Sequence, residues 1–272
     1  MKKLIVVIVL VMVLVLTSVN IGLAVTDGEL DGESHPHVVL LLMEVGGEPM
    51  YRCSATLLSP TVVLTAGHCT SNYPGSPYTG MRVFTESDVQ NGDNNYPYAG
   101  PNSVEATSWA AHPLYETAPF YVHDVGIVIL EEPIYLDAYG TLPLLNQFDS
   151  LKTKRGLQKT TFTSVGYGLQ ESFPDAASWK EHNVKIRMVA YPRLIQINTP
   201  GFTGDFSLLL SNNANTGGTC FGDSGGPNFL GNSNVVAGIT SFGMNGTCGG
   251  TGGVFRTDRQ DVLDFIYSYL KR

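Results

Sequence analysis

The sequence is poor in charged residues, and positive charges are the scarcest of them. Lysine and arginine together number 16, against 24 aspartates and glutamates, which gives the 272 residues a formal net charge of −8. Proteins that bind nucleic acid concentrate lysine and arginine to neutralise phosphate, and no basic run is present here. The composition therefore excludes nucleic acid as a partner.

The sequence also lacks internal repeats, and it has only four cysteines, none of them spaced as C-x-x-C. The absence of that motif argues against a zinc finger, and four cysteines in an exported protein indicate two disulfides, for which three pairings exist. Hydrophobic residues make up 43% of the chain, 30 residues are glycine and 15 are proline. Such a chain is an ordered globular protein with many turns between short strands, which favours an all-β fold.

The one long apolar run lies at the N-terminus. It spans Leu4–Leu16 after two lysines, and small residues surround Leu23 up to Ala24. This pattern predicts a signal peptide over residues 1–24, cleavage after Ala24 and a secreted protein, extracellular or periplasmic. The alternative is an uncleaved anchor, and only then would the chain contact a membrane; thirteen apolar residues fall short of the roughly twenty that span a bilayer.

After residue 25 the chain alternates short β-branched runs with turn-rich stretches, a pattern typical of strands. These runs are Val38–Val45, Ala55–Leu58, Val62–Leu64, Val125–Leu130 and Val235–Ile239. One segment differs: Thr257 to Gln260 fits a helix-capping box. The apolar residues of one helical face follow it, namely Val262, Ile266, Tyr269 and Leu270. We expect a C-terminal helix over about 258–271.

The most specific local motif is Gly-Asp-Ser-Gly-Gly-Pro at residues 222–227. A serine hydroxyl becomes an effective nucleophile only with a neighbouring base and with donors that stabilise the oxyanion it creates. Glycines around Ser224 allow a tight backbone turn that aims the N–H groups of Gly222 and Ser224 at one point. The motif predicts a nucleophile with its oxyanion hole; an ordinary glycine-rich turn is the alternative.

Two further motifs supply a base and a carboxylate. Thr-Ala-Gly-His-Cys at residues 65–69 places His68 just after a short strand, and an imidazole can accept and return a proton near neutral pH. His-Asp-Val-Gly-Ile at residues 123–127 places Asp124 before an apolar strand, where a carboxylate is costly without a partner. Taken singly, a core histidine and a turn aspartate are the alternatives.

Together these motifs resemble the chymotrypsin/trypsin serine proteases, over nearly the whole chain after Val25. The chain order His68, Asp124, Ser224 is the one that this family uses. The resemblance implies two six-stranded antiparallel β-barrels, about 25–150 and 151–256, with the active site in the cleft between them. The lysine-led leader suggests a bacterial member.

The resemblance also implies the roles of the residues. His68 would be general base and then acid, Asp124 would orient it, and Ser224 would form an acyl-enzyme. The implied disulfides are Cys53–Cys69 and Cys220–Cys248. Protein or peptide substrates, protein inhibitors, a monomeric state and no cofactor are also implied.

Activation by an ion pair is a further implication. In the family a new N-terminal amine pairs with the aspartate before the serine, here Asp223. Cleavage after Ala24 would expose Val25 as that amine, so we expect export and activation to be one event. A ragged N-terminus, with Asp27 in place of a family glycine, is the alternative.

The substrate pocket is expected to be open and uncharged. Gly218, followed by Thr219, stands where trypsins carry the aspartate that binds Arg or Lys, and Gly243 and Gly253 would form the walls. Cleavage after uncharged apolar residues follows. Ser241 and Gly243 would pair with the substrate backbone.

Three other functions compete. A catalytically inactive homologue would bind partners through the cleft, and an esterase would use the same triad on small substrates. A metal-binding protein would use His35, His37 and His68, although the proline between the first two separates their rings. Acidic residues of one loop (Glu86, Asp88 and Asp93) could hold a cation, but solvated loop acids explain them equally.

Overall fold

A computed structural model describes residues 25–71, 78–115, 121–151, 159–171, 183–200 and 202–271. The expected signal peptide, residues 1–24, lies outside the described residues. No helix in these ranges combines the length and the apolar character needed to cross a bilayer.

The first half of the chain forms a closed six-stranded barrel, with strand order β2-β3-β4-β7-β6-β5. Its strands are β2 (Val38–Val45), β3 (Glu48–Leu57), β4 (Val62–Thr65), β5 (Gly80–Phe84), β6 (Ser103–Ala111) and β7 (Gly126–Leu130). All pairs are antiparallel. Because the side chains of β2 and β4 are buried almost throughout, these strands are continuous apolar runs in the sequence.

The second half forms an antiparallel sheet of eight strands, with order β1-β9-β8-β12-β13-β14-β11-β10. Its strands are β1 (Glu29–Leu30), β8 (Phe162–Gly166), β9 (Met188–Ala190), β10 (Leu194–Thr199), β11 (Gly204–Asn212), β12 (Pro227–Leu230), β13 (Val236–Gly243) and β14 (Gly250–Arg256). An isolated bridge between Thr161 and Arg193 brings the start of β10 back to the start of β8. The fold class is confirmed, but the second barrel closes through this bridge and not through a full ladder.

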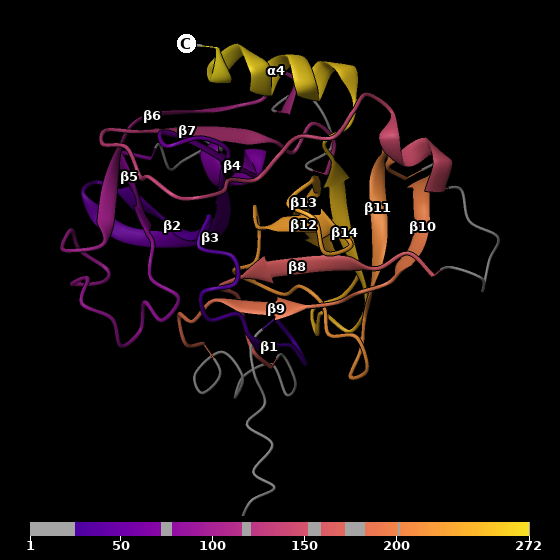
Figure 1. The fold of residues 1–272 in the computed structure, drawn as a ribbon, viewed down its shortest axis with the longest axis horizontal. Coiled ribbons are helices and arrows are strands. Elements are labelled where there is room, and N and C mark those ends of the chain that lie inside the picture. Colours follow the sequence, from indigo (N-terminus) through magenta and orange to yellow (C-terminus); the bar gives the residue numbers. More distant parts are fainter. Residues whose placement is uncertain are drawn as a thin grey trace, which may run out of the picture.

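The two units lie side by side and share one core (Figure 1). Val83 and Ile127 of the first barrel belong to the same buried cluster as Phe229 and Phe255 of the second. A smaller cluster around Phe162 fills the interior of the second unit. The two units therefore share a continuous apolar interior.

The C-terminal helix α4 (Gln260–Leu270) starts two residues later than expected. Its N-cap is Arg259, which makes no side-chain capping bond, so the predicted capping box is wrong. Thr257 is unavailable because its hydroxyl donates to the carbonyl of Val236. Val262 and Ile266 are buried as expected, and α4 lies across the first barrel, as Figure 1 shows at the top.

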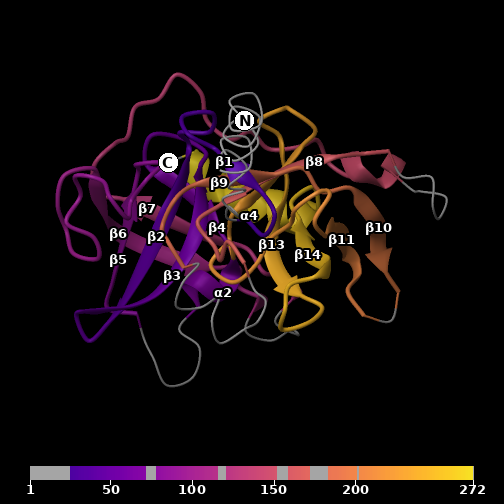
Figure 2. The same ribbon diagram turned by 90° about the horizontal axis from the view of Figure 1, so that it is seen from below.

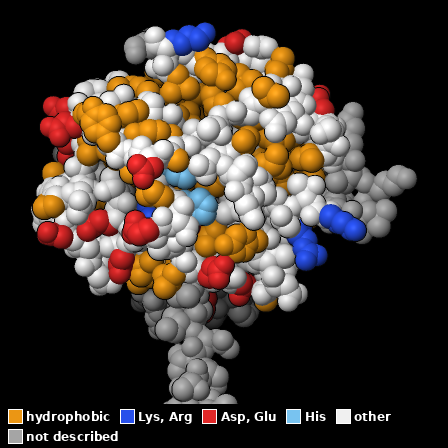
Figure 3. Space-filling model, viewed as in Figure 1, with side chains coloured by type: hydrophobic (Ala, Val, Ile, Leu, Met, Phe, Trp, Pro, Cys, Tyr) orange, Lys and Arg blue, Asp and Glu red, His pale blue; other side chains and the backbone are white. Residues whose placement is uncertain are grey.

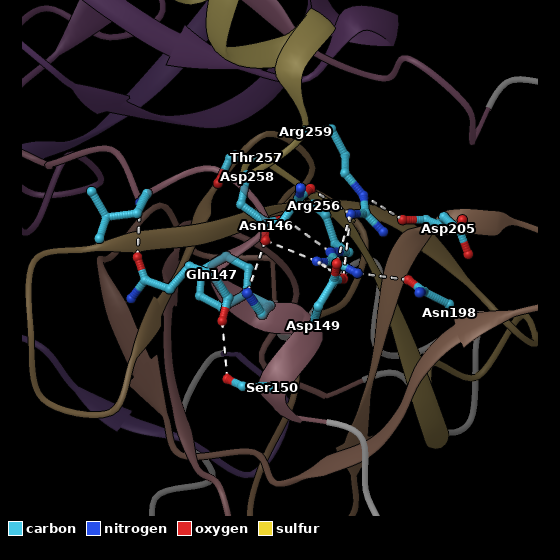
Figure 4. Close-up of polar contacts among 12 residues, drawn as sticks. Asn146, Gln147, Asp149, Ser150, Asn198, Asp205, Arg256, Thr257, Asp258 and Arg259 are labelled. Carbon is cyan, nitrogen blue, oxygen red and sulfur yellow. Dashed lines mark hydrogen bonds and ion pairs between the residues drawn. The ribbon is translucent and has the colours of Figure 1, made fainter.

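Asp258, the next residue of the expected capping box, pairs with Arg256 in an ionic network (Figure 4). The fully buried Arg256 donates to both carboxylate oxygens of Asp258 at 2.9 and 2.8 Å, and to Asp149 at 2.9 Å. Asp149 belongs to the 3-10 helix η2 (Gln147–Leu151). The network fastens the segment between the barrels to the end of β14, and removal of one partner from such a buried pair costs about 3–5 kcal/mol.

Both implied disulfides, Cys53–Cys69 and Cys220–Cys248, are present. On the face drawn in Figure 3, acidic side chains gather mostly over the first barrel, and basic ones are few. This distribution agrees with the net charge of −8.

Candidate active site

His68 and Asp124 are brought together by two paired strands. His68 lies in the short helix α2 (Gly67–Thr70), directly after β4, and Asp124 lies two residues before β7. Because Thr65 of β4 pairs with Gly126 of β7, both residues leave the barrel at the same edge. Figure 2 shows α2 beside the boundary between the first barrel and the orange-to-yellow strands of the second unit.

Asp124 is fully buried, and three donors compensate its charge. The backbone N–H of His68 donates to Oδ1 at 2.8 Å, and His68 Nδ1 lies 2.9 Å from Oδ2. The hydroxyl of Ser241 donates to Oδ2 at 2.5 Å. The ladder between β13 and β14 shifts register between Thr240 and Phe242. This bulge leaves Ser241 out of the ladder, where its side chain can meet Asp124. Sequence reasoning had assigned Ser241 only to substrate binding.

The environment of His68 favours its protonated form. Burial lowers the pKa of His68, but the charge of Asp124 and the hydrogen bond to it outweigh this, so the pKa lies above its ordinary value of 6.5. Asp124 also accepts from Nδ1, which leaves Nε2 on the open side of the ring. The His68 side chain remains 29% exposed.

The loop around Ser224 packs directly onto the segment that carries His68. The carbonyl of Ser224 accepts the N–H of Ser54 at 2.8 Å. A side chain at Gly225, where φ is +81°, would overlap Thr65 and Ala66. Ser224 therefore lies beside the segment that leads to His68, although no hydrogen bond joins the two side chains in the described structure. Such catalytic bonds often form only when substrate is bound.

The backbone around Ser224 has the form of an anion-binding turn. Gly222 has φ of +97°, a conformation that side chains disfavour. The N–H groups of Gly222 and Ser224 donate to nothing among the described residues, whereas the intervening N–H of Asp223 donates to Cys220. Two free donors on one turn can stabilise a developing oxyanion.

Asp223 is fully buried, and both its carboxylate oxygens accept backbone N–H groups. Gly168 donates at 2.8 Å and Cys220 at 2.9 Å. Burial nevertheless raises the pKa of Asp223 to about 7, against the effects of these bonds and of the Arg52 charge. Within the described residues Asp223 has no ion pair, and Val25, a buried residue in peptide linkage here, packs with Met188 and Ala190. The expected pair between Val25 and Asp223 requires the amine that cleavage after Ala24 would free, and it stays a prediction.

Arg52 is a neighbour of this loop that sequence reasoning missed. Its guanidinium lies against Gly222: a side-chain carbon there would lie 3.1 Å from Nη2. Arg52 also donates to Asn183, and its charge lowers the pKa of Asp223. Nothing in the residue pattern around Cys53 signals this role, because it depends on the packing of the second unit.

A cavity of about 360 Å³ opens next to Ser224. No charged side chain lines it; its walls are Thr219, Cys220, Phe221, Ser224, Thr240, Ser241, Phe242, Gly243, Asn245, Gly246 and Cys248. Thr219, Ser241 and Gly243 are therefore placed at this cavity as expected.

Gly218 and Gly253 are not among the residues that line this cavity, and their role in substrate binding stays a prediction. A side chain at Gly218 would overlap the amide of Asn212, because this glycine faces the neighbouring strand β11. At Gly253 the space is filled by the ring of Phe242, which itself lines the cavity. Counting sequence positions from Ser224 could not reveal that Asn212 lies beside Gly218 or that Phe242 lies beside Gly253.

The three alternative histidine ligands do not converge on one point, although the rings of His35 and His37, which the proline was expected to separate, meet edge-on with centres 5.9 Å apart. His35 Nδ1 lies 2.5 Å from Asp31, His68 faces Asp124, and burial lowers the pKa of His37 to about 4. In the exposed loop, Glu86 accepts the N–H of Asp93. Among the described residues, neither set forms a cluster suited to an ion.

Comparison with known proteins identifies the class. The chain matches the family model described as Trypsin over residues 28–266, and it therefore belongs to the trypsin family of serine proteases. Brachyurin from Leptuca pugilator is 28% identical over 222 residues, covering 79% of this chain and 84% of that protein. Phenoloxidase-activating factor 3 from Holotrichia diomphalia is 27% identical over 256 residues, covering 88% and 70%. These relatives come from animals and do not support the bacterial origin that the leader suggested.

Solved structures share the fold. HL collagenase superimposes with a TM-score of 0.67 at 20% identity, covering 91% of this chain and 99% of that chain. A mutant of human heparin binding protein gives 0.64 at 18% identity, covering 91% and 97%. At these identities the likeness concerns the fold alone.

Proposed function

We propose that the protein is an active serine endopeptidase, with Ser224 as nucleophile, His68 as general base and acid, and Asp124 as the group that orients His68. The observation that carries this proposal is the buried Asp124, which lies 2.9 Å from His68 Nδ1 and accepts the hydroxyl of Ser241, a residue that lines the same cavity as Ser224. Membership of the trypsin family makes proteins or peptides the substrate class.

The residues have complementary tasks in this mechanism. His68 Nε2 takes the proton from Ser224 as its hydroxyl oxygen attacks the scissile carbonyl, and Asp124 stabilises the resulting imidazolium. The N–H groups of Gly222 and Ser224 receive the oxyanion. His68 then gives the proton to the leaving amine, and water hydrolyses the acyl-enzyme by the same steps. Because His68 must be neutral to accept the proton, activity is expected to rise as pH rises through its elevated pKa.

The primary specificity follows from the cavity. An uncharged pocket offers no partner to a buried Arg or Lys cation, so the enzyme cleaves after uncharged apolar residues.

A peptide library resolved by mass spectrometry tests both parts of the proposal. Cleavage after apolar residues, absent from the His68→Gln variant, is the expected result. A clear preference for Arg or Lys would contradict the specificity. No cleavage by a folded chain beginning at Val25 would favour the inactive, cleft-binding alternative.

Thr219→Asp is expected to redirect specificity, because Thr219 lines the cavity. The new carboxylate would pair with a basic side chain, and a buried charge pair of this kind changes binding by about 3 kcal/mol. The ratio of kcat/KM for Arg against Leu substrates should therefore rise about 10²-fold. Gly218→Asp is the matched comparison: it should misfold or stay apolar-specific, because its side chain would overlap Asn212. Equal redirection by both variants would contradict this description of the pocket.

Ser241→Ala is expected to lower kcat about tenfold with little change in KM. Asp124 loses one charge-assisted hydrogen bond, worth about 1.5–3 kcal/mol, and His68 is held less firmly. The acid limb of the pH–rate profile should also move upward, because the less stabilised carboxylate favours the imidazolium more. Steady-state kinetics measure both quantities, with Ser233→Ala, a change at an exposed turn residue, as the control that should keep the parent rate. If kcat of Ser241→Ala stayed within twofold of the parent, the role of Ser241 would be purely structural.

Secretion and activation complete the proposal. Cleavage of the leader after Ala24 would export the chain and free the amine of Val25. Thr26 pairs with Gly218, five residues before Asp223, so the start of this segment is already attached to the chain that leads to Ser224. N-terminal sequencing of the exported protein should give Val25; another start would contradict this processing.

A further inference from the structure

A second cluster of chemically active side chains lies on the other side of Asp124. It joins His112, which follows β6, His123, which precedes Asp124, and Asp261 in the first turn of α4. One ring nitrogen from each histidine and one carboxylate oxygen all lie within 4.8 Å of one another. Two imidazoles and a carboxylate form a donor set that binds zinc and similar divalent transition-metal ions.

The contacting atoms of His123 and Asp261 are as far apart as two neighbouring ligand atoms of one metal ion, and no hydrogen bond joins them. Nδ1 of His123 lies 3.0 Å from Oδ2 of Asp261. This nitrogen is buried, and within the described chain its contact with Asp261 is an ion-pair contact that does not have the geometry of a hydrogen bond. Neighbouring ligand atoms around an ion with bonds of about 2.1 Å lie roughly 3.0–3.4 Å apart. An ion would satisfy both atoms, whereas the pair alone does not.

The surroundings are suited to an ion that enters from one side. Phe265 packs against His112, with ring centres 5.2 Å apart, and Phe206 packs against His123 at 5.4 Å. Asp261 remains 38% exposed and leaves a route from solvent. Such an apolar shell with one open side strengthens metal–ligand interactions.

Occupation of the cluster requires a local rearrangement. The rings of His112 and His123 are stacked, with centres 4.9 Å apart and planes at 10°. A metal ion lies in the plane of each imidazole that binds it, so ligation must turn the rings out of this stack. The contacts given up include the 3.2 Å bond from the N–H of Leu114 to Nδ1 of His112 and the hydrogen bond between the His112 ring and the backbone of Asp261.

The backbone of both histidines is hydrogen-bonded around Asp124. The carbonyl of His123 accepts the N–H of Val125 at 2.8 Å, which encloses Asp124 in a three-residue turn. His123 itself has φ of +55°, and the N–H of His112 donates to the carbonyl of Val125 at 2.8 Å. Both histidines therefore belong to the backbone framework that aims Asp124 at His68.

We propose that His112, His123 and Asp261 form a binding site for a zinc-class divalent ion, and that its occupation lowers proteolysis by displacing Asp124 from His68. The proposed binding of the ion concerns these three residues alone. The proposed inhibition of proteolysis rests on the proposed function.

Equilibrium dialysis of zinc against the full chain carrying Ser224→Ala tests binding without self-digestion. One ion per chain is expected, with affinity at least tenfold weaker after Asp261→Asn. Asp264→Asn, a carboxylate on the same helix that bonds Gln260, is the control and should bind as the parent does. No binding up to about 1 mM zinc, or equal binding by all three proteins, would overturn the site.

Peptide hydrolysis by the otherwise native chain tests inhibition. Zinc should inhibit at the concentration at which it binds, and Asp261→Asn should move that midpoint at least tenfold upward. An unmoved midpoint would mean that zinc acts elsewhere, for instance at His68, and binding without inhibition would overturn the inhibitory half. A chain without peptidase activity at any zinc concentration contradicts the proposed function instead, and the dialysis result still decides the site.

Discussion

Replacement of Ser224 by alanine is expected to lower kcat on a peptide substrate by about 10⁶-fold, the scale seen when a triad nucleophile is removed. The substitution removes the attacking oxygen and leaves His68 paired with Asp124. Because the Ser224 hydroxyl makes no hydrogen bond with the described residues, the free energy of unfolding should change by less than about 0.5 kcal/mol. Steady-state kinetics and chemical denaturation measure the two quantities.

Ser268→Ala, an exposed serine on α4, is the control for this experiment. It should retain the parent rate. A Ser224→Ala protein that loses less than about 10²-fold would contradict a nucleophilic role, since oxyanion stabilisation and binding alone leave only a residual rate.

The uncut chain is expected to lose stability as pH rises from about 4 to about 7. Asp223 has a pKa of about 7 when folded, against an ordinary value of 3.8, so between these values the folded chain binds a proton that the unfolded chain has released. Stability therefore falls with pH in this window and is level above it. The full change corresponds to roughly 4 kcal/mol, at about 1.4 kcal/mol per pH unit.

The chain that begins at Val25 should not show this loss, because the released amine would pair with Asp223 and lower its pKa. Urea denaturation of both forms, each carrying Ser224→Ala, at several pH values makes the comparison. Asp223→Asn in the uncut form is the control, since the amide does not titrate and should flatten the slope. Equal slopes in uncut, cut and Asp223→Asn proteins would show that another group is responsible.

The sequence allowed the fold class to be predicted because its informative features are local. Apolar runs such as Val62–Leu64 are buried strands in the structure, and the cysteine couples form the two implied disulfides. The contact between His68 and Asp124 also follows from local features, because each residue lies at the end of a strand and the two strands pair.

The remaining features depend on packing between distant segments. The ring of Phe242 fills the space beside Gly253, and Gly218 faces Asn212, and neither neighbour could be predicted from sequence spacing. Thr257 fits a helix cap, but the carbonyl of Val236 takes its hydroxyl. Arg52 reaches the Ser224 loop only because the two units pack against each other.

Labelling of the exported protein by a fluorophosphonate probe, read by intact mass, tests the central claim most directly. Such a probe reacts only with a serine that has a functioning base and an oxyanion hole. We expect a single adduct on a chain beginning at Val25, and we expect Ser224→Ala to abolish it. A folded, correctly cut chain that forms no adduct would contradict the claim.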